Sequence, residues 1–339
     1  MSYSCARCNR TFVKRSVFEQ HQARKRPCII RPASPARPFT QQMVLLKPVL
    51  KWVGGKTQLL ETILPRFPRT MHHYHEPFLG GGSVLFALLA HRNAGLLTLT
   101  GTVHASDTNP ALIGLYQCIQ KEPEALIREV RTLQTEYSQC DTNDINRTPT
   151  TLEEALTNRE SYYYWTRATF NQLSQEERMS VKGAALLLFL NKTCFRGVYR
   201  EGPHGFNVPY GNNVNPGIMD EMHIRAVSSL IQEVRFTVMS FEDSLSAVQQ
   251  GDFVYLDPPY APESRTSFVS YVAGGFTKHQ ALFEWCQKGI SSWMMSNADV
   301  PLVRDFFPLH ETIVLSCKRT IHSTKPNTKT NEVLIWHAM

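Results

Sequence analysis

Residues 73–107 read HYHEPFLGGGSVLFALLAHRNAGLLTLTGTVHASD, and this stretch decides the expected fold. It contains a strand candidate at 73–78, a glycine-rich turn, an apolar helix candidate at 83–90, and a second strand candidate at 98–106 followed by Asp107. The order of strand, glycine turn, helix, strand and acid is typical of a doubly wound nucleotide-binding sheet. We therefore expect an α/β protein with a ligand site at this turn.

The same pattern continues near the C-terminus, whereas the middle of the chain departs from it. Residues 252–256 predict a buried strand, and 293–296 and 333–336 predict two further strands. The segment 112–235 is polar and helical with a Gly, Asn and Pro-rich patch at 197–217, which predicts an inserted domain. The expected boundaries are 44–111 and 236–339 for the sheet domain and 112–235 for the inserted domain.

Positive charge is concentrated at the N-terminus. The chain carries 36 Lys and Arg against 29 Asp and Glu, a net charge of +7. Residues 1–40 hold nine Lys and Arg and one acid, a net of +8, so the remaining 299 residues net about −1. A basic arm of this kind suits binding to phosphate groups, and a solvated, disordered tail is the alternative that charge alone leaves open.

Residues 1–28 have the cysteine and histidine spacing of a small metal-bound unit. Cys5-x2-Cys8 is followed by Phe12, Phe18 and His21, which resembles a two-Cys, two-His zinc finger with a cysteine as the last ligand. So short a unit buries too little core to fold alone, and tetrahedral zinc would supply the folding free energy. DNA, RNA and protein stay open as its target, and 29–43 predict a linker. The expected zinc ligands are Cys5, Cys8, His21 and Cys28.

The sequence shows no sign of a membrane span or a secretory signal. No stretch approaches the roughly 20 consecutive apolar residues of a membrane helix, and Cys5 and Arg7 stand where a signal peptide is apolar. Its eight cysteines favour metal binding over disulfides. We expect an intracellular protein of the cytoplasm, or of the nucleus or virion if it comes from a virus of eukaryotes, without a membrane partner.

Two segments have the composition of a nucleotide site. In Glu76-Pro-Phe-Leu-Gly-Gly-Gly-Ser83 the glycines let a ligand approach the backbone, although the spacing is not that of a phosphate-binding loop. Asp107 lies where an acid can bond ribose hydroxyls, and a helix N-cap before Asn109 is its alternative role. An aromatic ring and two lysines surround a tight turn in Leu50-Lys-Trp-Val-Gly-Gly-Lys56. This segment is either a surface turn or a wall of the ligand pocket.

Asp257-Pro-Pro-Tyr260, directly after a buried strand, is the most informative tetrapeptide. The exocyclic nitrogen of adenine is a poor nucleophile because its lone pair is delocalised into the ring. A carboxylate and a backbone carbonyl that accept from its two N–H groups would push it towards sp³ geometry and stabilise the positive charge of methyl transfer. The prolines fix the turn, the tyrosine offers a stacking face, and the base must be flipped out of the duplex. A structural Pro-Pro turn after a strand-ending acid is the alternative.

From residue 51 to about 336 the chain resembles the Dam-type (D12 class) DNA adenine-N6 methyltransferases in motif order and spacing. The resemblance implies a Rossmann-like fold, S-adenosyl-L-methionine as cofactor, and methyl transfer to the N6 amino group of adenine in duplex DNA by base flipping. The matching segments are 50–56 for the opening motif, 76–82 for the cofactor loop, 188–192 and 205–211 for the target-recognition hairpin, and 257–260 for the catalytic motif.

The resemblance also implies roles for individual residues. Asp257 would hold the adenine amino group and Tyr260 the flipped ring, within the catalytic set Asp257, Pro258, Pro259 and Tyr260. The cofactor would contact Trp52, Lys56, Glu76, Pro77, Phe78, Gly80, Gly82, Asp107 and Asp257. DNA would contact Lys51, Arg196, Val198, Arg200, Asn207 and Pro209.

The hairpin departs from the family pattern at three places. Arg196 stands where an asparagine is usual, the loop at 201–205 is a residue shorter, and Asn212 replaces a basic residue. The resemblance makes GATC the expected recognition site. The three departures in the hairpin leave open whether this chain reads it. An RNA or protein-amide methyltransferase of the same fold, and an inactive zinc-finger DNA-binding protein, are the alternatives. Besides duplex DNA, we expect a cognate restriction endonuclease as partner, and a monomer.

Two clusters outside these motifs are expected to be structural. His72, His73 and His75 lie close together, but no neighbouring cysteine or acid pattern completes a metal site. Residues 162–165 read YYYW in a helical region, and core packing is a better prediction for them than base stacking.

Overall fold

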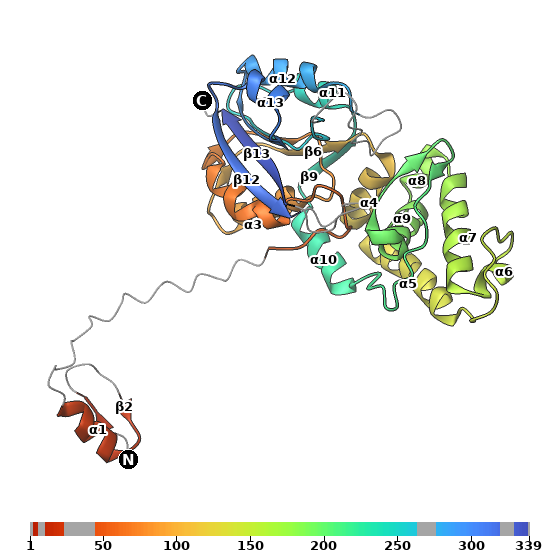
Figure 1. Cartoon of the computed structure of the whole chain (residues 1–339), viewed down its shortest axis with the longest axis horizontal. Coiled ribbons are helices and arrows are strands. Elements are labelled where there is room, and N and C mark those ends of the chain that lie inside the picture. The colour runs from red at the N-terminus through yellow and green to blue at the C-terminus, as the bar shows by residue number, and fades with distance from the viewer. Residues whose placement is uncertain (1–2, 6–10, 24–44, 263–275, 319–328, 338–339) are drawn as a thin grey trace. The chain divides into compact units, whose positions relative to one another are not determined.

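A computed structural model describes residues 3–5, 11–23, 45–262, 276–318 and 329–337. The chain forms two compact units, Met1–Met43 and Val44–Met339. The smaller unit contains β1 (Tyr3–Ser4), β2 (Thr11–Phe12) and α1 (Arg15–Gln22), which Figure 1 shows in red. Its two strands pair in antiparallel fashion, and the ring of Phe12 packs on that of Phe18 with 5.8 Å between centroids.

The larger unit is built on a seven-stranded sheet. Its strands are β4 (Tyr74–Glu76), β6 (Val103–Asp107), β9 (Val234–Val238), β10 (Phe253–Leu256), β11 (Ser292–Ala298), β12 (Glu311–Lys318) and β13 (Lys329–His337). Their order across the sheet is β12-β13-β11-β10-β4-β6-β9. All pairs from β11 to β9 are parallel, and the β12–β13 hairpin is antiparallel at one edge.

Helices cover both faces of this sheet. They are α3 (Ser83–Asn93), α4 (Pro110–Lys121), α11 (Phe241–Ser246), α12 (His279–Gln287) and α13 (Pro301–Phe306). The buried residues of β10 explain the arrangement, because successive side chains of a strand point to opposite faces. Phe253 and Tyr255 belong to a core shared with α3 and α4, whereas Val254 and Leu256 belong to a second core shared with α11 to α13. A continuous apolar run is what a parallel strand between two helical layers requires.

The chain between β6 and β9 is mostly helical. It contains α5 (Pro123–Gln139), α6 (Leu152–Leu156), α7 (Arg159–Gln172), α8 (Gln175–Arg178), α9 (Val181–Thr193), η3 (Phe195–Gly197), β7 (Glu201–Gly202), β8 (Gly205–Phe206) and α10 (Glu221–Leu230). α9 is buried from Gly183 through Asn191, and α5 and α7 pack against it. Figure 1 shows α5 to α9 gathered beside the sheet. A separate inserted domain at 112–235 stays a prediction, as do the other domain boundaries.

The predicted α/β class with a mostly parallel central sheet is confirmed, and the helix predicted at 83–90 is α3. The strand predicted at 98–106 is wrong as a single element. β5 (Thr98–Leu99) pairs with β3 (Thr70–Met71) in a separate small sheet, and only β6 joins the central one. Gly101 makes the break, because its N–H donates to the carbonyl of His72 at 2.7 Å. A Cβ at Gly101 would lie 2.5 Å from the ring of His73, which explains the glycine.

Three short helices precede β3 and complete the larger unit. They are η1 (Thr57–Leu59), α2 (Leu60–Ile63) and η2 (Leu64–Arg66). Among the helices of the described residues, none combines the length and the apolar character that crossing a bilayer demands.

Candidate active site

A cavity of about 990 Å³ opens where the parallel strands end. The carboxyl ends of β4, β6 and β10 bring Glu76, Asp107 and Asp257 into its wall. Ligands of open α/β sheets bind at this edge, and small-molecule sites typically have volumes of about 300–1,000 Å³. The predicted cofactor residues that line the cavity are Trp52, Lys56, Glu76, Pro77, Phe78, Gly80, Asp107 and Asp257.

The glycine-rich loop between β4 and α3 lies tightly against Trp52. Gly80 has a φ of +49°, and a Cβ on it would lie 2.9 Å from the Trp52 ring, so this approach requires glycine. Gly82, which the sequence also predicts to bind the cofactor, is not among the described residues that line the cavity. It is the N-cap of α3, with a φ of +70°. Gly80 therefore shapes the cavity wall, whereas Gly82 begins the helix behind it.

Asp107 holds the same loop from the neighbouring strand. Its Oδ2 accepts a hydrogen bond from the N–H of Gly80 at 3.1 Å, and its Oδ1 accepts from the N–H of Asn109 at 3.0 Å. The N-cap of α4 is Asn109, whose side chain accepts from the N–H of Leu112. The alternative role of Asp107 as a helix cap is therefore wrong. Burial raises the pKa of this carboxyl, which lies in the cavity wall.

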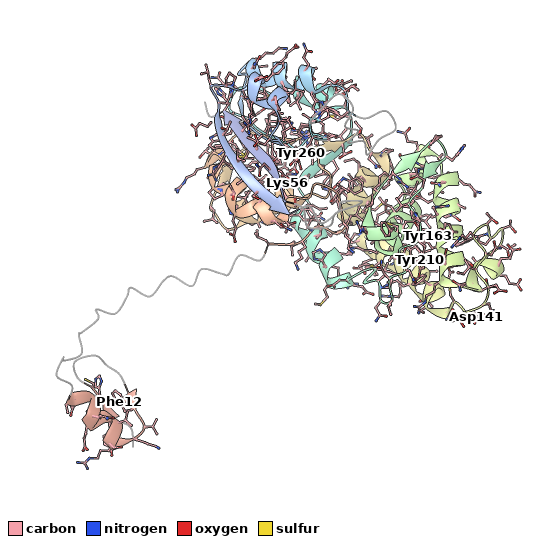
Figure 2. All side chains as sticks on the ribbon, viewed as in Figure 1. Phe12, Lys56, Asp141, Tyr163, Tyr210 and Tyr260 are labelled. Carbon is pink, nitrogen blue, oxygen red and sulfur yellow. The ribbon has the colours of Figure 1, made fainter. Side chains whose placement is uncertain are left out.

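Lys56 and Asp257 form a salt bridge inside the cavity. The Lys56 Nζ lies 2.7 Å from the Asp257 Oδ2, and the two side chains are 3% and 19% exposed. The same ammonium donates to the carbonyl of Gly54 and lies 5.1 Å from the centroid of the Tyr260 ring. Figure 2 shows Lys56 and Tyr260 next to each other at the sheet. The residue predicted to contact a cofactor is thus also the partner of the predicted catalytic acid.

Two acids in the cavity wall differ in their protonation. Burial raises the pKa of Asp257 to about 6, although the charge of Lys56 opposes the shift. Burial also raises the pKa of Glu76 to about 8, although the hydroxyl of Tyr74 donates to its Oε2 at 2.7 Å. At neutral pH Asp257 is therefore ionised and Glu76 protonated. The acid that the sequence predicts to be catalytic is a charged hydrogen-bond acceptor.

The tetrapeptide predicted to be catalytic and the residue after it are held by three residues from distant segments. None of the three received a role from the sequence, because they lie 20, 36 and 72 positions from their partners. His279 Nε2 donates to the carbonyl of Pro259 at 2.8 Å. Asn297 Oδ1 accepts from the N–H of Ala261 at 2.9 Å, and Glu332 Oε2 accepts from the hydroxyl of Tyr260 at 2.8 Å.

The predicted DNA-contacting residues of the hairpin lie along the segment 195–211. Arg196, Arg200, Asn207 and Pro209 are exposed and Val198 is half-buried. The Arg200 Nε donates to the Asn207 Oδ1 at 2.7 Å, so two of these residues bond each other across the β7–β8 hairpin. The carbonyl of Pro209 accepts from the N–H of Phe195 at 2.9 Å.

Lys51 is exposed and reaches this segment through Asn191. The Asn191 side chain bonds both the N–H and the carbonyl of Lys51, at 2.9 and 2.8 Å, and also the carbonyl of Gly197 at 3.1 Å. Asn191 belongs to the motif at 188–192, but the sequence did not predict this role because the partner lies 140 positions away. The structure therefore places Lys51 beside the predicted recognition hairpin.

Two of the departures from the family pattern coincide with unusual backbone. Arg196 has a φ of +57° and Asn212 a φ of +50°. Asparagine adopts this left-handed conformation more readily than other residues with a side chain, so Asn212 fits and Arg196 does not. The Arg196 guanidinium lies 5.0 Å from the centroid of the Phe195 ring.

The aromatic cluster at 162–165 packs in the core, as predicted, and also holds the base of the hairpin. Tyr162 and Tyr163 are fully buried. The Tyr163 hydroxyl donates to the carbonyl of Val208 at 2.7 Å, and the Tyr210 hydroxyl lies 2.6 Å from that of Tyr137. Figure 2 shows Tyr163 and Tyr210 together in the helical part of the chain.

In the small N-terminal unit, two of the four predicted zinc ligands are described. Cys5 and His21 are both buried, at 4% and 6% exposure, and the ring of Phe12 lies 4.8 Å from that of His21. Phe12 is labelled in Figure 2. The other two predicted ligands, Cys8 and Cys28, lie outside the described residues.

A histidine cluster lies at the opposite, amino-terminal edge of the sheet. The expectation that no acid joins it is wrong, because Asp252 approaches His75 Nε2 at 3.2 Å and His72 Nδ1 at 3.5 Å. This acid is 177 positions from His75, beyond the reach of a local pattern. The His73 Nδ1 accepts from the N–H of Thr102 at 2.7 Å, so its proton lies on Nε2, where a metal would need a lone pair. We interpret the cluster as structural.

Comparison with known proteins now separates the alternatives. The family described as D12 class N6 adenine-specific DNA methyltransferase matches residues 52–321. The Type II methyltransferase M.MjaIII of Methanocaldococcus jannaschii is 37% identical over 68% of this chain and 75% of its own length. The Type II methyltransferase M1.LlaDCHI of Lactococcus lactis subsp. cremoris is 32% identical over 77% of this chain and 84% of its own length. The Retron Ec67 DNA adenine methylase of Escherichia coli is 30% identical over 80% of this chain and 85% of its own length.

These matches agree with the motifs in the cavity wall and support DNA adenine methylation over the readings as an RNA methyltransferase, a protein-amide methyltransferase or an inactive DNA-binding protein. S-adenosylmethionine is the methyl donor expected of this family. The chain belongs to the D12 class of N6 adenine-specific DNA methyltransferases and methylates adenine in DNA.

Proposed function

We propose that Asp257, the carbonyl of Pro258 and the ring of Tyr260 hold a flipped adenine while its N6 nitrogen is methylated. All three groups belong to residues of the cavity wall. Among the described residues, none donates a hydrogen bond to the Pro258 carbonyl, whereas His279 occupies that of Pro259. One carboxylate oxygen and one carbonyl are thus available for the two N–H groups of the base. The observation that carries this proposal is that the Asp257 carboxylate, paired with Lys56, lines one cavity together with Pro258 and Tyr260.

The same cavity fits the cofactor. When bound, S-adenosylmethionine supplies an electrophilic methyl group. Asp107 would accept from ribose hydroxyls, with Gly80 providing the close backbone approach that a Cβ would block. Trp52 and Phe78, both in the cavity wall, would contact the adenosyl group. Lys56 keeps Asp257 ionised and, within reach of the cavity, would also attract the methionine carboxylate.

We further propose that the segment 195–211, with Lys51, reads the target sequence and that the target is GATC. Support comes from the exposed Arg196, Arg200 and Asn207, which lie beside Lys51 through the Asn191 contacts. Exposed arginines and asparagines suit hydrogen bonding to base edges in the major groove. On this view the residues from 112 to 235 form a target-recognition domain.

The test is methyl transfer from labelled S-adenosylmethionine into matched duplexes with GATC or with the same bases in another order. Single-stranded DNA and duplex RNA complete the substrate panel. Asp257→Ala should slow incorporation by about a hundred-fold or more, while Asp305→Ala, which removes an exposed acid on α13, is the matched control and should not slow it. Incorporation into both duplexes alike would refute GATC reading but keep the enzyme. Full incorporation by Asp257→Ala would refute the proposed catalytic role.

We also propose that residues 1–28 bind one Zn²⁺ through Cys5, Cys8, His21 and Cys28. The support is that a cysteine and a histidine are both buried in a unit with little other core. Elemental analysis of the full-length protein should find one zinc per chain, and Cys5→Ser should lose it. Cys140→Ser, a partly buried cysteine of the larger unit, should keep it. A zinc-free wild type after purification without chelator would overturn the assignment.

Two relatives bear the name Type II methyltransferase, which favours a cognate restriction endonuclease as the partner enzyme. We propose this partnership for the present chain as well. DNA from cells that express the protein should resist one endonuclease whose site includes the methylated adenine. Resistance that survives Asp257→Ala would contradict a role of methylation in this protection.

A further inference from the structure

Glu332 reaches the catalytic edge through the topology of the sheet. β13 runs antiparallel to β11, and Glu332 lies opposite Ala298, the last residue of β11. The first half of β13 therefore lies at the edge where the parallel strands end. Glu332 lines the same cavity as Asp257 and Tyr260, although the sequence gave this residue no functional role.

The side chain of Glu332 has a defined partner there. The Tyr260 hydroxyl donates to the Glu332 Oε2 at 2.8 Å. On the neighbouring strand, the Asn297 Oδ1 accepts from the N–H of Ala261 at 2.9 Å, which fixes the backbone directly after the tyrosine. β11 thus holds the backbone of this turn, and β13 holds the end of its aromatic side chain.

This contact restricts the motion that matters for stacking. A tyrosine ring has two torsions, and a hydrogen bond at its hydroxyl fixes the far end of the ring and so restricts χ1. The phenolic O–H prefers the plane of the ring, so the direction of the acceptor also favours one orientation about χ2. An ionised carboxylate accepts hydrogen bonds only, and charge-assisted bonds are about twice as strong as neutral ones. A ring that is already oriented does not lose that freedom when the base arrives, so binding is tighter and more uniform.

We propose that Glu332 is a positioning residue that holds the Tyr260 ring in the plane on which the flipped adenine stacks. The inference rests on the stacking role proposed above for Tyr260. Glu332 has a second route to the reaction, since its negative charge adds to burial in raising the pKa of Asp257. The experiment must therefore separate the hydrogen bond from the charge.

A double-mutant cycle does so. Glu332→Ala removes acceptor and charge, Glu332→Gln keeps an acceptor oxygen without the charge, and Tyr260→Phe removes only the hydroxyl. Glu311→Ala, an exposed glutamate on β12 of the same hairpin, is the matched control. The readouts are the single-turnover rate of methyl transfer and the fluorescence of 2-aminopurine at the target position. Melting temperature and cofactor affinity of each variant establish that the fold and the cofactor site are intact.

Positioning through the hydroxyl predicts that Glu332→Ala and Tyr260→Phe each slow methyl transfer about ten- to a hundred-fold. The double variant should be no slower than either single variant, because both remove the same bond. Glu332→Gln should recover most of the rate, and 2-aminopurine fluorescence should change in parallel with the rates. Glu311→Ala should behave as the wild type.

Three results would overturn the proposal. Independent, multiplying effects in the double variant would show that Glu332 does not act through the Tyr260 hydroxyl. A Glu332→Gln variant as slow as Glu332→Ala, with a shifted acid limb of its pH profile, would assign the effect to charge on Asp257. Unchanged rates in folded Glu332→Ala would remove any role. The stacking role of Tyr260 is tested separately. A fully active Tyr260→Ala variant would refute that role itself, and not only the positioning role of Glu332.

Discussion

The two ends of β10 carry two acids with opposite properties, one buried and one half-buried. Asp252, before the strand, accepts from the N–H groups of His73 and Gln249 at 3.0 and 2.9 Å and also contacts His75. Burial pushes its pKa up, but these donors outweigh burial, and the pKa is lowered. Asp257, after the strand, has one ammonium as its charged partner, and burial raises its pKa to about 6.

The difference lies in how many acceptor sites each carboxylate has left. A carboxylate has about four lone-pair sites, and backbone donors and histidines already use those of Asp252. Asp257 retains capacity that faces a cavity large enough for a ligand. Burial alone therefore does not identify a functional acid. The informative property is a buried charge whose hydrogen bonds are incomplete until a substrate arrives.

The largest expected effect comes from removing the acid at the cavity. Asp257→Ala should slow methyl transfer by about 10²–10⁴-fold, because the adenine amino group loses its charged acceptor. The variant also leaves the buried Lys56 ammonium without its charged partner, so some loss of stability is expected as well. Single-turnover kinetics and chemical denaturation measure the two effects separately. A folded Asp257→Ala variant that transfers methyl groups at the wild-type rate would break the contrast between the two ends of β10.

The complementary change should reverse the pattern. Asp252→Ala leaves the N–H groups of His73 and Gln249 without their acceptor and should lower the free energy of unfolding by about 3 kcal/mol. The rate of methyl transfer per folded molecule should stay near that of the wild type at low temperature. Urea denaturation is the measurement, with the exposed-site variant Asp305→Ala as control. A stable but inactive Asp252→Ala protein would contradict a purely structural role.

Acid should inactivate the enzyme through Asp257. Its pKa is raised to about 6, so it is protonated below that pH and loses an acceptor for the adenine N–H. The single-turnover rate should fall about tenfold per pH unit below pH 6. A rate profile from pH 5 to 8, with folding monitored in parallel, measures this limb. A limb near the ordinary aspartate value of about 4 would argue that Asp257 is not desolvated in solution.

The smallest effect concerns stability at the amino edge. Burial lowers the pKa of His75, and it lowers the pKa of His104 to about 4. The unfolded chain takes up protons at these histidines below about pH 6.5 while the folded chain does not, so stability falls as pH drops from 6.5 towards 4. His104→Phe keeps a ring to stack on His75 and should flatten this dependence. Denaturation midpoints at several pH values test it, and equal slopes for both proteins would refute it.

Much of the cavity could be predicted from the sequence, because short motifs at strand ends meet at one edge of a parallel sheet. Glu76, Asp107 and Asp257 follow that rule. Contacts made across the fold could not be predicted in this way. Glu332 and Asn191 act on partners 72 and 140 positions away, and no local periodicity encodes such distances.

Local patterns also misled where a tertiary contact decided the outcome. The segment 98–106 predicts one strand, but the turn at Gly101 packs against His72 and His73 and divides it. The sequence around the histidine cluster contains no acid that completes it, and Asp252 supplies one from the residue directly before β10. In both cases the missing information was which segments become neighbours.

The left-handed backbone of Arg196 makes this position a place where robustness can be engineered. An arginine in that conformation is less stable than an asparagine or glycine by about 1 kcal/mol. Its guanidinium lies 5.0 Å from the centroid of the Phe195 ring, so a contact within the fold offsets part of this cost. Exchanging Arg196 for asparagine would relax the backbone and remove the ring contact together, so stability and the surface of the hairpin change at one position.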